Sequence, residues 1–415
     1  MADSLLDIYR VLDLTDEKGY LCGKILADLG VDVIKIEKVG GDPGRKCGPF
    51  YGDNPGPDNS LYWWAFNCNK RGVTLNIESS DGQEIFKRLS KSCDFVLESF
   101  PPGYMESLGL GYSALSQANL KLIMVSITPF GQTGPYKNYK SCDLVSMAMG
   151  GIMYLCGDTD RPPVRISCPQ AYLHAGAHAA VGAMSALYSR TRTGEGQHVD
   201  VSIQASLLST LMHARGFWDL NRVVLHRGGQ IRSGVTEKTG VRLLWQCKDG
   251  YVCYNLGGGV AQSLSNQNLV NYMVSEGMAT PTLKETDWKT FHFGRASQQQ
   301  IDQLEEPIGE FLMTHTKAEL DKEASERRII LYQVATVEDI FNSPQLASRD
   351  FWVEIEHPEL NRTITYPGPF IKSTQTPIKL SRRAPLIGEH NEEIYIRELG
   401  LSTEDLVILK QAGII

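Results

Sequence analysis

The hydrophobic pattern of the first 200 residues alternates between short apolar runs and segments with helical periodicity. The apolar runs are typical of buried strands, and they lie at 12–14, 31–37, 94–100, 120–128 and 198–203. Helical patterns separate them at 20–29, 81–92, 143–153 and 170–190. Strands that alternate with helices predict a parallel sheet with helices on both faces, as in doubly wound α/β proteins.

The helix predicted at 170–190 differs from the others because its pattern consists of Ala and Gly. Small residues recur at Ala171, Ala175, Gly176, Ala179, Ala180, Gly182 and Ala183. Such a surface lets another backbone approach closely, so we expect this helix to be packed and buried. A turn at 193–196 follows, with glycines where a positive φ is favourable, and it leads into the last strand of the series.

The pattern changes after Ser209, which indicates domain boundaries. Residues 212–240 carry scattered Arg and Gly without a clear period, and we interpret them as a linker after a large domain at 1–211. A hairpin with Asp249-Gly250 at its turn then opens a small α+β domain at 241–330, which polar helices complete. Residues 331–415 are expected to return to the large domain.

Composition and charge narrow the classes of function. A net charge of −7 without a long basic run argues against nucleic acid as the main partner. The cysteine count of nine is odd and no C-x-x-C occurs, which favours reduced thiols over disulfides or a zinc site. The sequence has no signal-peptide pattern and no apolar run of about 18 residues. We therefore expect a cytoplasmic protein without bound metal and without membrane contact.

Several longer motifs carry a resemblance to a known family. They are RTRTGEGQHVDVS at 190–202, NCNKR at 67–71, GQTGPY at 131–136 and SPQLASRDFW at 343–352. In these motifs the sequence resembles the class III CoA-transferases, and the resemblance covers almost the whole chain. It implies the fold of that family: a large Rossmann-like doubly wound α/β domain and a small α+β domain in an interlocked dimer.

The resemblance also implies which residues would contact CoA. Cations in loops suit the phosphates of CoA; Lys70-Arg71 alone is more typical of a solvated basic turn, and the family motif around it favours contact with CoA instead. The candidate CoA-binding residues are Lys38, Arg45, Lys70, Arg71, Phe100, Lys140 and the loop Gly257, Gly258 and Gly259. In the family this loop closes over the reacting thioester; three glycines alone are also typical of a strand-to-helix turn. Where the family motif has Asn and two basic residues, this chain has Ser99, Pro101 and Ser107, which weakens the expectation of CoA binding.

Tyr172 stands where the family has its catalytic aspartate, four residues before Gly176. In the family reaction a carboxylate attacks the acyl-CoA thioester, forms a mixed anhydride and then holds CoA as an aspartyl thioester. A phenol titrates near ~10 and has no carbonyl to carry CoA. Because no acidic residue occurs between Arg161 and Gly194, we predict that this chain has no catalytic residue.

Two further groups near this position have open interpretations. His174 and His178 lie four residues apart and could share a helix face, but no third metal ligand is evident, so packing or surface roles are expected. Asp16 and Glu17 in the first loop would repel an anionic substrate unless Lys18 offsets them. The alternative is an ordinary helix N-terminus with favourable acidic residues.

The sequence therefore predicts a non-catalytic subunit of a heteromeric class III CoA-transferase. Its partner would be a homologous subunit that carries the aspartate, with an acyl-CoA and a dicarboxylate as substrates, CoA bound mainly by the partner and no permanently bound cofactor. Within the family, the resemblance favours transfer of CoA from succinyl-CoA to (R)-2-benzylsuccinate in anaerobic toluene breakdown. The alternatives are a CoA-binding scaffold without activity and an acyl-CoA racemase-like enzyme, which would need an Asp–His pair.

Overall fold

The computed structural model describes residues 4–233 and 239–415. The chain divides into two compact units. The large unit comprises Met1–Met153, Arg165–Arg222 and Gln345–Ile415, and the small unit comprises Tyr154–Val164 and Val223–Pro344. The small unit is thus longer than the domain expected at 241–330, and the chain returns to the large unit at Gln345 rather than at residue 331.

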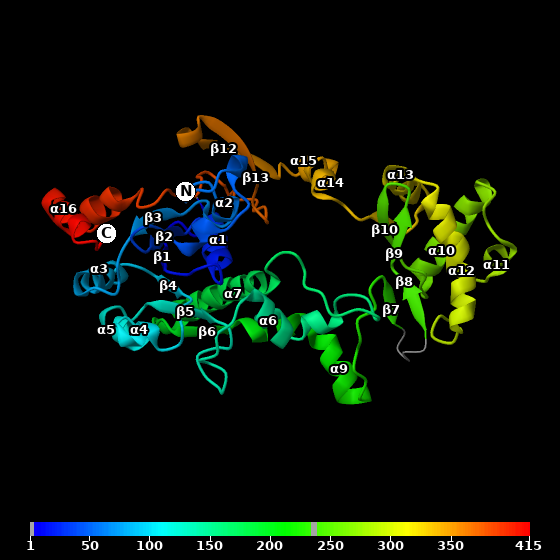
Figure 1. Ribbon diagram of the computed structural model, residues 1–415, viewed down its shortest axis with the longest axis horizontal. Coiled ribbons are helices and arrows are strands. Elements are labelled where there is room, and N and C mark those ends of the chain that lie inside the picture. The colour runs from blue at the N-terminus through cyan, green and yellow to red at the C-terminus, as the bar shows by residue number, and fades with distance from the viewer. Residues whose placement is uncertain (1–3, 234–238) are drawn as a thin grey trace. The chain divides into compact units, whose positions relative to one another are not determined.

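A six-stranded parallel sheet in the order β3-β2-β1-β4-β5-β6 forms the centre of the large unit (Figure 1). The strands are β1 (Arg10–Asp13), β2 (Asp32–Glu37), β3 (Arg71–Thr74), β4 (Phe95–Glu98), β5 (Ile123–Thr128) and β6 (His198–Ser202). The strand order reverses between β1 and β4, which confirms the predicted doubly wound topology. In such sheets ligands bind outside the carboxyl ends of the strands at this switch point.

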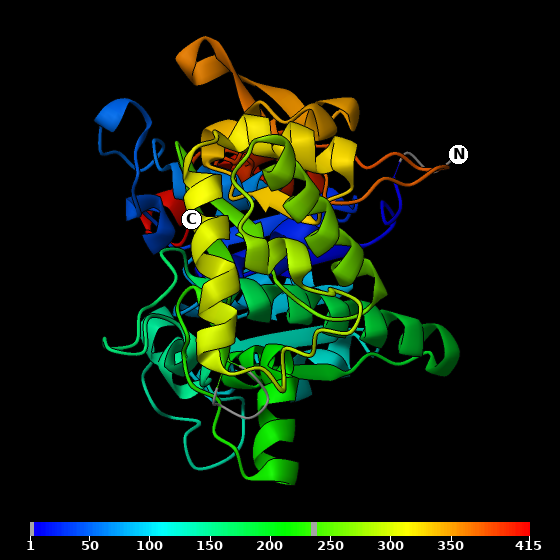
Figure 2. The same cartoon turned by 90° about the vertical axis from the view of Figure 1, so that its right-hand side faces the viewer.

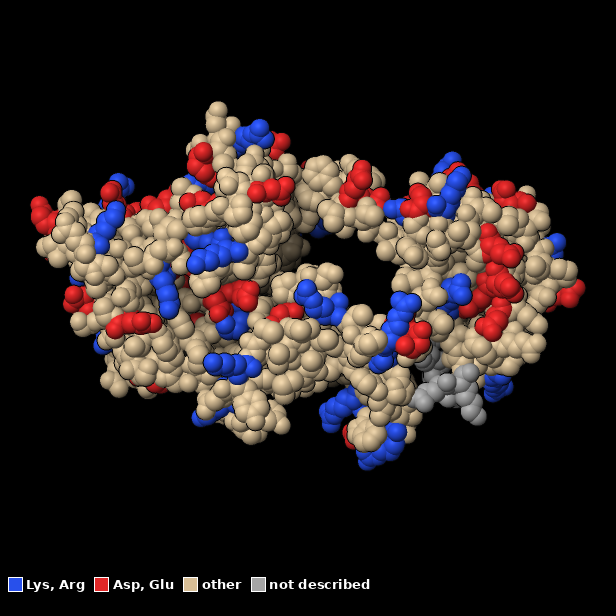
Figure 3. Space-filling view, in the orientation of Figure 1, with Lys and Arg blue, Asp and Glu red and all other residues tan. Residues whose placement is uncertain are grey.

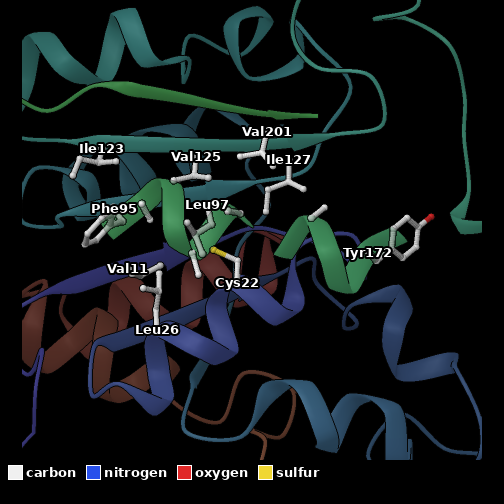
Figure 4. Close-up of a cluster of buried hydrophobic side chains, with 14 of the residues drawn as sticks. Val11, Cys22, Leu26, Phe95, Leu97, Ile123, Val125, Ile127, Tyr172 and Val201 are labelled. Carbon is white, nitrogen blue, oxygen red and sulfur yellow. The ribbon is translucent and has the colours of Figure 1, made fainter. Parts of the chain in front are cut away.

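Helices cover both faces of the sheet because alternate strand residues point to opposite sides. Val11 and Leu12 are both fully buried, yet they belong to two different hydrophobic clusters. The first cluster, drawn in Figure 4, includes α1 (Tyr20–Asp28), α7 (Gln170–Thr193) and α8 (Ile203–Leu208). The second includes α3 (Ser80–Ser90), α4 (Tyr104–Ser107), α5 (Tyr112–Ala118), the π-helix η6 (Glu392–Glu398) and α16 (Thr403–Gln411).

Helix α7 is buried through its small residues, as predicted. Gly176 lies against α1: a Cβ there would be 2.8 Å from Cβ of Leu21 and 3.2 Å from the backbone nitrogen of Cys22. The helix ends at Gly194, whose φ of +79° is the left-handed conformation that terminates many helices. Arg190 in the last turn forms an ion pair of 2.8 Å with Asp94, which fixes α7 to the loop before β4.

The C-terminal segment completes the large unit beside strand β3. The hydroxyl of Tyr395 donates to the carbonyl of Thr74 at 2.8 Å, and the carbonyl of Ile414 accepts the N–H of Asn76 at 2.7 Å. The remaining elements of this unit are α2 (Leu61–Asn67), α6 (Asp143–Met149), α9 (Met212–Asn221), α15 (Pro344–Ser348) and the hairpin of β12 (Trp352–His357) and β13 (Arg362–Pro367). Residues more than 300 positions apart therefore share one core.

The small unit consists of a three-stranded antiparallel sheet with helices packed on it (Figures 1 and 2). Its strands are β9 (Leu244–Cys247), β10 (Gly250–Tyr254) and β11 (Leu331–Gln333), and its main helices are α10 (Val260–Ser275), α11 (Pro281–Glu285), α12 (Gln298–Met313), α13 (Lys317–Arg327) and α14 (Val337–Phe341). The predicted hairpin is present, but Gly250 pairs with Cys247, so the turn residues are Lys248 and Asp249, one position earlier than expected. Acidic side chains gather over α12 (Figure 3).

The interval 212–240, predicted as a linker, contains regular structure. Helix α9 belongs to the large unit and has no buried residue. Strand β7 (Ile231–Ser233) pairs with β8 (Gly240–Arg242), and residues 234–238 of the expected linker lie outside the described residues.

In the described ranges no helix combines the length and apolar character needed to cross a membrane. All nine cysteines are free thiols.

Candidate functional site

Tyr172 lies in the first turn of α7 and is 5% exposed. Figure 4 shows its ring at the end of the helix, with the hydroxyl pointing away from the aliphatic side chains of the cluster. Burial, assisted by the nearby carboxylates of Glu17 and Asp16, raises the pKa of Tyr172 far above its ordinary value. The phenol therefore keeps its proton at physiological pH.

Asp143, the first residue of α6, is a carboxylate beside the same helix turn. Its Oδ1 accepts the N–H of Ala171 at 2.9 Å. Because Pro169 at the start of α7 offers no side-chain cap, Asp143 satisfies a helix N–H that would otherwise lack a partner. Burial raises the pKa of Asp143. Asp143 lies outside the acid-free interval from Arg161 to Gly194 and reaches α7 only through the fold, so the sequence around Tyr172 does not reveal it.

The loop after β1 brings Asp16 to the same edge of the sheet. Asp16 forms an ion pair with Lys18, and its Oδ1 accepts the hydroxyl of Ser99 at 2.8 Å. The Ser99 hydroxyl in turn accepts the backbone N–H of Asp16 at 2.9 Å. Lys18 thus offsets one of the two acids, and Ser99, which stands at the family's asparagine, joins the loops that follow β1 and β4.

A cavity of about 430 Å³ lies outside the carboxyl ends of β1 to β4, across the switch point of the sheet. Two of the predicted CoA-binding residues, Lys38 and Phe100, line it together. The rings of Phe100 and Tyr104 pack 4.7 Å apart. The other lining residues are Leu14, Asp16, Ile36, Glu37, Val39, Asp42, Pro43, Leu75, Asn76, Ile77 and Glu78. The volume and the aromatic wall suit a nucleoside-sized ligand.

Lys70, in contrast, is fully buried and bound within the chain. Its ammonium group donates to Asp13 Oδ2 at 2.9 Å, to Asn67 Oδ1 at 3.0 Å and to the carbonyl of Tyr20 at 3.3 Å. Burial opposes the ionisation of Asp13, but Lys70 and Lys35 outweigh it and hold the pKa of Asp13 below its ordinary value. Lys70 therefore stabilises the sheet, and its placement does not support the expected contact with phosphate.

Arg45 and Arg71 are likewise occupied inside the large unit. The guanidinium of Arg45 forms a bidentate pair with Glu37, at 2.6 and 2.7 Å, and lies 4.0 Å from the ring of Trp63. The guanidinium of Arg71 binds Asp32 at 2.6 Å and Glu393 at 2.7 Å, and also contacts Glu398. Both side chains join distant segments, which explains the basic motifs without a ligand.

Lys140, His174 and His178 do not line this cavity, and the predicted glycine loop belongs to the small unit. Lys140 is exposed on the loop between β5 and α6. The glycines 257–259 connect β10 to α10 in the small unit, where Gly259 has a φ of +91°. His174 and His178 are both partly exposed on α7. Within residues 4–233 and 239–415, no group of three His, Cys, Asp or Glu side chains could hold a metal ion.

Comparison with known proteins decides the family. Residues 6–391 match the family model described as CoA-transferase family III. The chain belongs to CoA-transferase family III. This confirms the family resemblance found in the sequence motifs and agrees with the doubly wound sheet.

Family III relatives act on several substrates according to their names. The chain is 36% identical over 393 residues to the BbsE subunit of succinyl-CoA:(R)-benzylsuccinate CoA-transferase of Thauera aromatica, covering 94% of this chain and 93% of the relative. It is 30% identical to succinyl-CoA–D-citramalate CoA-transferase of Chloroflexus aurantiacus, covering 99% of this chain and 98% of the relative.

Solved structures of family III agree with the fold. The crystal structure of a CaiB/BaiF family protein from Brucella suis superposes with a TM-score of 0.81 at 26% identity, covering 95% of this chain and all of that one. The structure of Rv3272 from Mycobacterium tuberculosis, at 24% identity, has the same fold with a TM-score of 0.73 and covers 94% of this chain and 98% of its own.

Proposed function

We propose that this chain is the non-catalytic subunit of a heteromeric family III CoA-transferase. The observation that carries the proposal is the protonated phenol of Tyr172 in the first turn of α7, where the family has its aspartate. A homologous partner subunit supplies the carboxylate. This chain then serves to complete the assembly.

The chemistry explains why the substitution is decisive. The acyl carrier must attack a thioester as an anion and then present a carbonyl carbon to the released CoA thiolate. A carboxylate does both, since the mixed anhydride breaks to give an aspartyl thioester and a free acid. A phenol could at most accept the acyl group as an ester, because it has no carbonyl of its own to form the CoA thioester.

The substrates follow from the relatives. The 36% identity to a subunit of succinyl-CoA:(R)-benzylsuccinate CoA-transferase supports these two substrates for the complex. The internal ion pairs of Arg45, Lys70 and Arg71 support binding of CoA mainly by the partner, because these cations have no free face for phosphate.

A second candidate is favoured by Asp143, whose carboxylate lies at the first turn of α7. In that case the chain would be active by itself, with Asp143 as the acyl carrier. Its Oδ1 is committed to the helix N–H of Ala171, and rotation toward a substrate would leave that N–H without its partner. We therefore rank this candidate second.

The decisive experiment assays CoA transfer from succinyl-CoA to (R)-2-benzylsuccinate with the chain alone, the partner alone and the two together. We expect activity only from the complex, and a Tyr172→Phe complex should retain it. Trapping with hydroxylamine during turnover, followed by peptide mass spectrometry, should place the hydroxamate on a partner carboxylate. Turnover by this chain alone that is lost in Asp143→Asn, with a hydroxamate at Asp143, would establish the second candidate instead.

A further inference from the structure

The cavity at the switch point has an unusual charge balance for a site that would hold phosphates. Among the described residues that line it there is one cation, Lys38, and there are four carboxylates, Asp16, Glu37, Asp42 and Glu78. Phosphate sites in proteins normally present cations and backbone N–H groups to the ligand.

Three of the four carboxylates are neutralised by cations outside the cavity. Glu37 forms the bidentate pair with Arg45, and Asp16 forms the ion pair with Lys18. Asp42 lies 3.4 Å from the ammonium of Lys35 and accepts the N–H of Gly44 at 2.8 Å. Glu37 and Asp42 are therefore held in buried ion pairs, while Asp16, whose side chain is 39% exposed, is offset by Lys18.

Glu78 differs from these three acids because it pairs with Lys38, the cation of the cavity wall. Its side chain is 57% exposed, and its Oε1 lies 3.6 Å from the ammonium of Lys38 and accepts the hydroxyl of Tyr104 at 2.8 Å. The hydrogen bond from Tyr104 and the charge of Lys38 lower the pKa of Glu78, so it is ionised at neutral pH. The one cation on the cavity wall thus already faces a carboxylate.

We propose that Glu78 makes this cavity reject phosphate-bearing ligands while it still accepts an uncharged aromatic nucleoside. The ring of Phe100 and the apolar residues Ile36, Leu75 and Ile77 offer a surface for a base such as adenine. The phosphates of CoA would meet the Glu78 carboxylate instead of a free Lys38. The inference rests on the proposed function and gives a physical reason why CoA is left to the partner subunit.

The test measures affinities by titration calorimetry of the full-length chain without its partner. The ligands are adenosine, 3′-dephospho-CoA and CoA, which carry an increasing number of phosphate charges. For the native chain we expect adenosine to bind at least as tightly as CoA. Glu78→Gln should improve the affinity for CoA about tenfold and that for dephospho-CoA less, because like charges at contact distance cost on the order of a factor of ten in binding. Adenosine should be unaffected.

The matched control is Glu84→Gln, which removes the same charge from the exposed side of α3, outside the residues that line the cavity. Equal gains in Glu78→Gln and Glu84→Gln, equal gains for adenosine and CoA, or no gain at all would overturn the proposal. None of these results depends on the transfer assay with the partner. Failure of this inference is therefore distinguishable from failure of the proposed function.

Discussion

Two sets of basic residues, which the sequence presents as one class, have different environments in the structure. Arg45 and Lys70 are almost completely buried and bind carboxylates of the same unit. Lys38 is 68% exposed and lies on the wall of a cavity. Lys38 follows β2 at the carboxyl edge of the sheet, Arg45 lies in the segment after it, and Lys70 precedes β3 at the amino end of that strand. The comparison shows that burial, more than motif membership, separates a cation that holds the fold from one that can meet a ligand.

The energetic contrast between the two sets is large. When one member of a buried pair is removed, the other charge stays in the interior without compensation, which costs about 3–5 kcal/mol. An exposed pair is hydrated in both states and screened by salt, so its loss changes little. Two of the four variants below, Lys70→Met and Lys38→Ala, test this contrast directly. The other two test a buried carboxyl group and a close helix contact in the same unit.

The largest effect is expected from Lys70→Met, which removes the nearer of the two ammonium groups that face the buried Asp13 and leaves only Lys35, at 3.8 Å. We predict a loss of about 3–5 kcal/mol in the free energy of unfolding, measured by urea denaturation. The double variant Asp13→Asn/Lys70→Met should recover part of this loss because no isolated charge remains. A single variant as stable as the native chain would contradict the structural role of Lys70.

The next effect depends on pH and concerns Glu98 at the end of β4. Burial raises the pKa of Glu98 to about 7, while Ser126 and the N–H of Phe100, at 2.7 Å, bind its carboxylate. Between the ordinary carboxyl pKa and pH 7 the unfolded chain loses this proton and the folded chain keeps it, so stability falls as pH rises and is then constant.

Glu98→Gln is neutral at every pH and escapes this cost. The stability of the variant relative to the native chain should therefore increase between pH 4.5 and pH 8, by up to about 3 kcal/mol. Urea denaturation at a series of pH values measures this difference. Glu84→Gln, which removes an exposed charge from α3, is the control. Parallel pH profiles for the native chain and Glu98→Gln would show that Glu98 does not titrate in this range.

Gly176→Ala tests the close contact between α7 and α1. The added methyl group would lie 2.8 Å from Cβ of Leu21, so the helices must separate, at a cost of about 1–3 kcal/mol. Thermal unfolding of Gly216→Ala provides the comparison, because a Cβ at Gly216 in α9 has no neighbour within 4 Å. That variant should be as stable as the native chain or slightly more stable, since Ala favours helix.

The smallest effect is expected from Lys38→Ala. Its side chain is exposed and paired only with another exposed group, so the melting temperature should match that of the native chain within error. The variant instead changes the charge of the cavity wall, and any residual CoA affinity should fall. A clear drop in melting temperature would place Lys38 with the buried cations and remove the distinction.

The fold could be predicted from the sequence because the strands of a parallel sheet are buried on both faces and appear as continuous apolar runs. The run at 120–128 and the Ala-rich helix are examples, and their ends shift by only a few residues. Helix α9 could not be predicted, because an exposed helix without a buried face lacks the periodic signal. The candidate site was harder to predict from the sequence, because the contacts of Asp143 with α7 and of Glu78 with Lys38 form only in the tertiary fold.

The position of the C-terminal segment has a consequence for biosynthesis. Strand β3 is complete when residue 74 has been made, but the residues that bind beside it, Tyr395 and Ile414, are made more than 300 residues later. At 5–20 residues per second, roughly 20 to 70 seconds separate the two events. During this interval the edge of the nascent sheet has no cover from its own chain, so chaperone binding or early association with another subunit would protect it from aggregation.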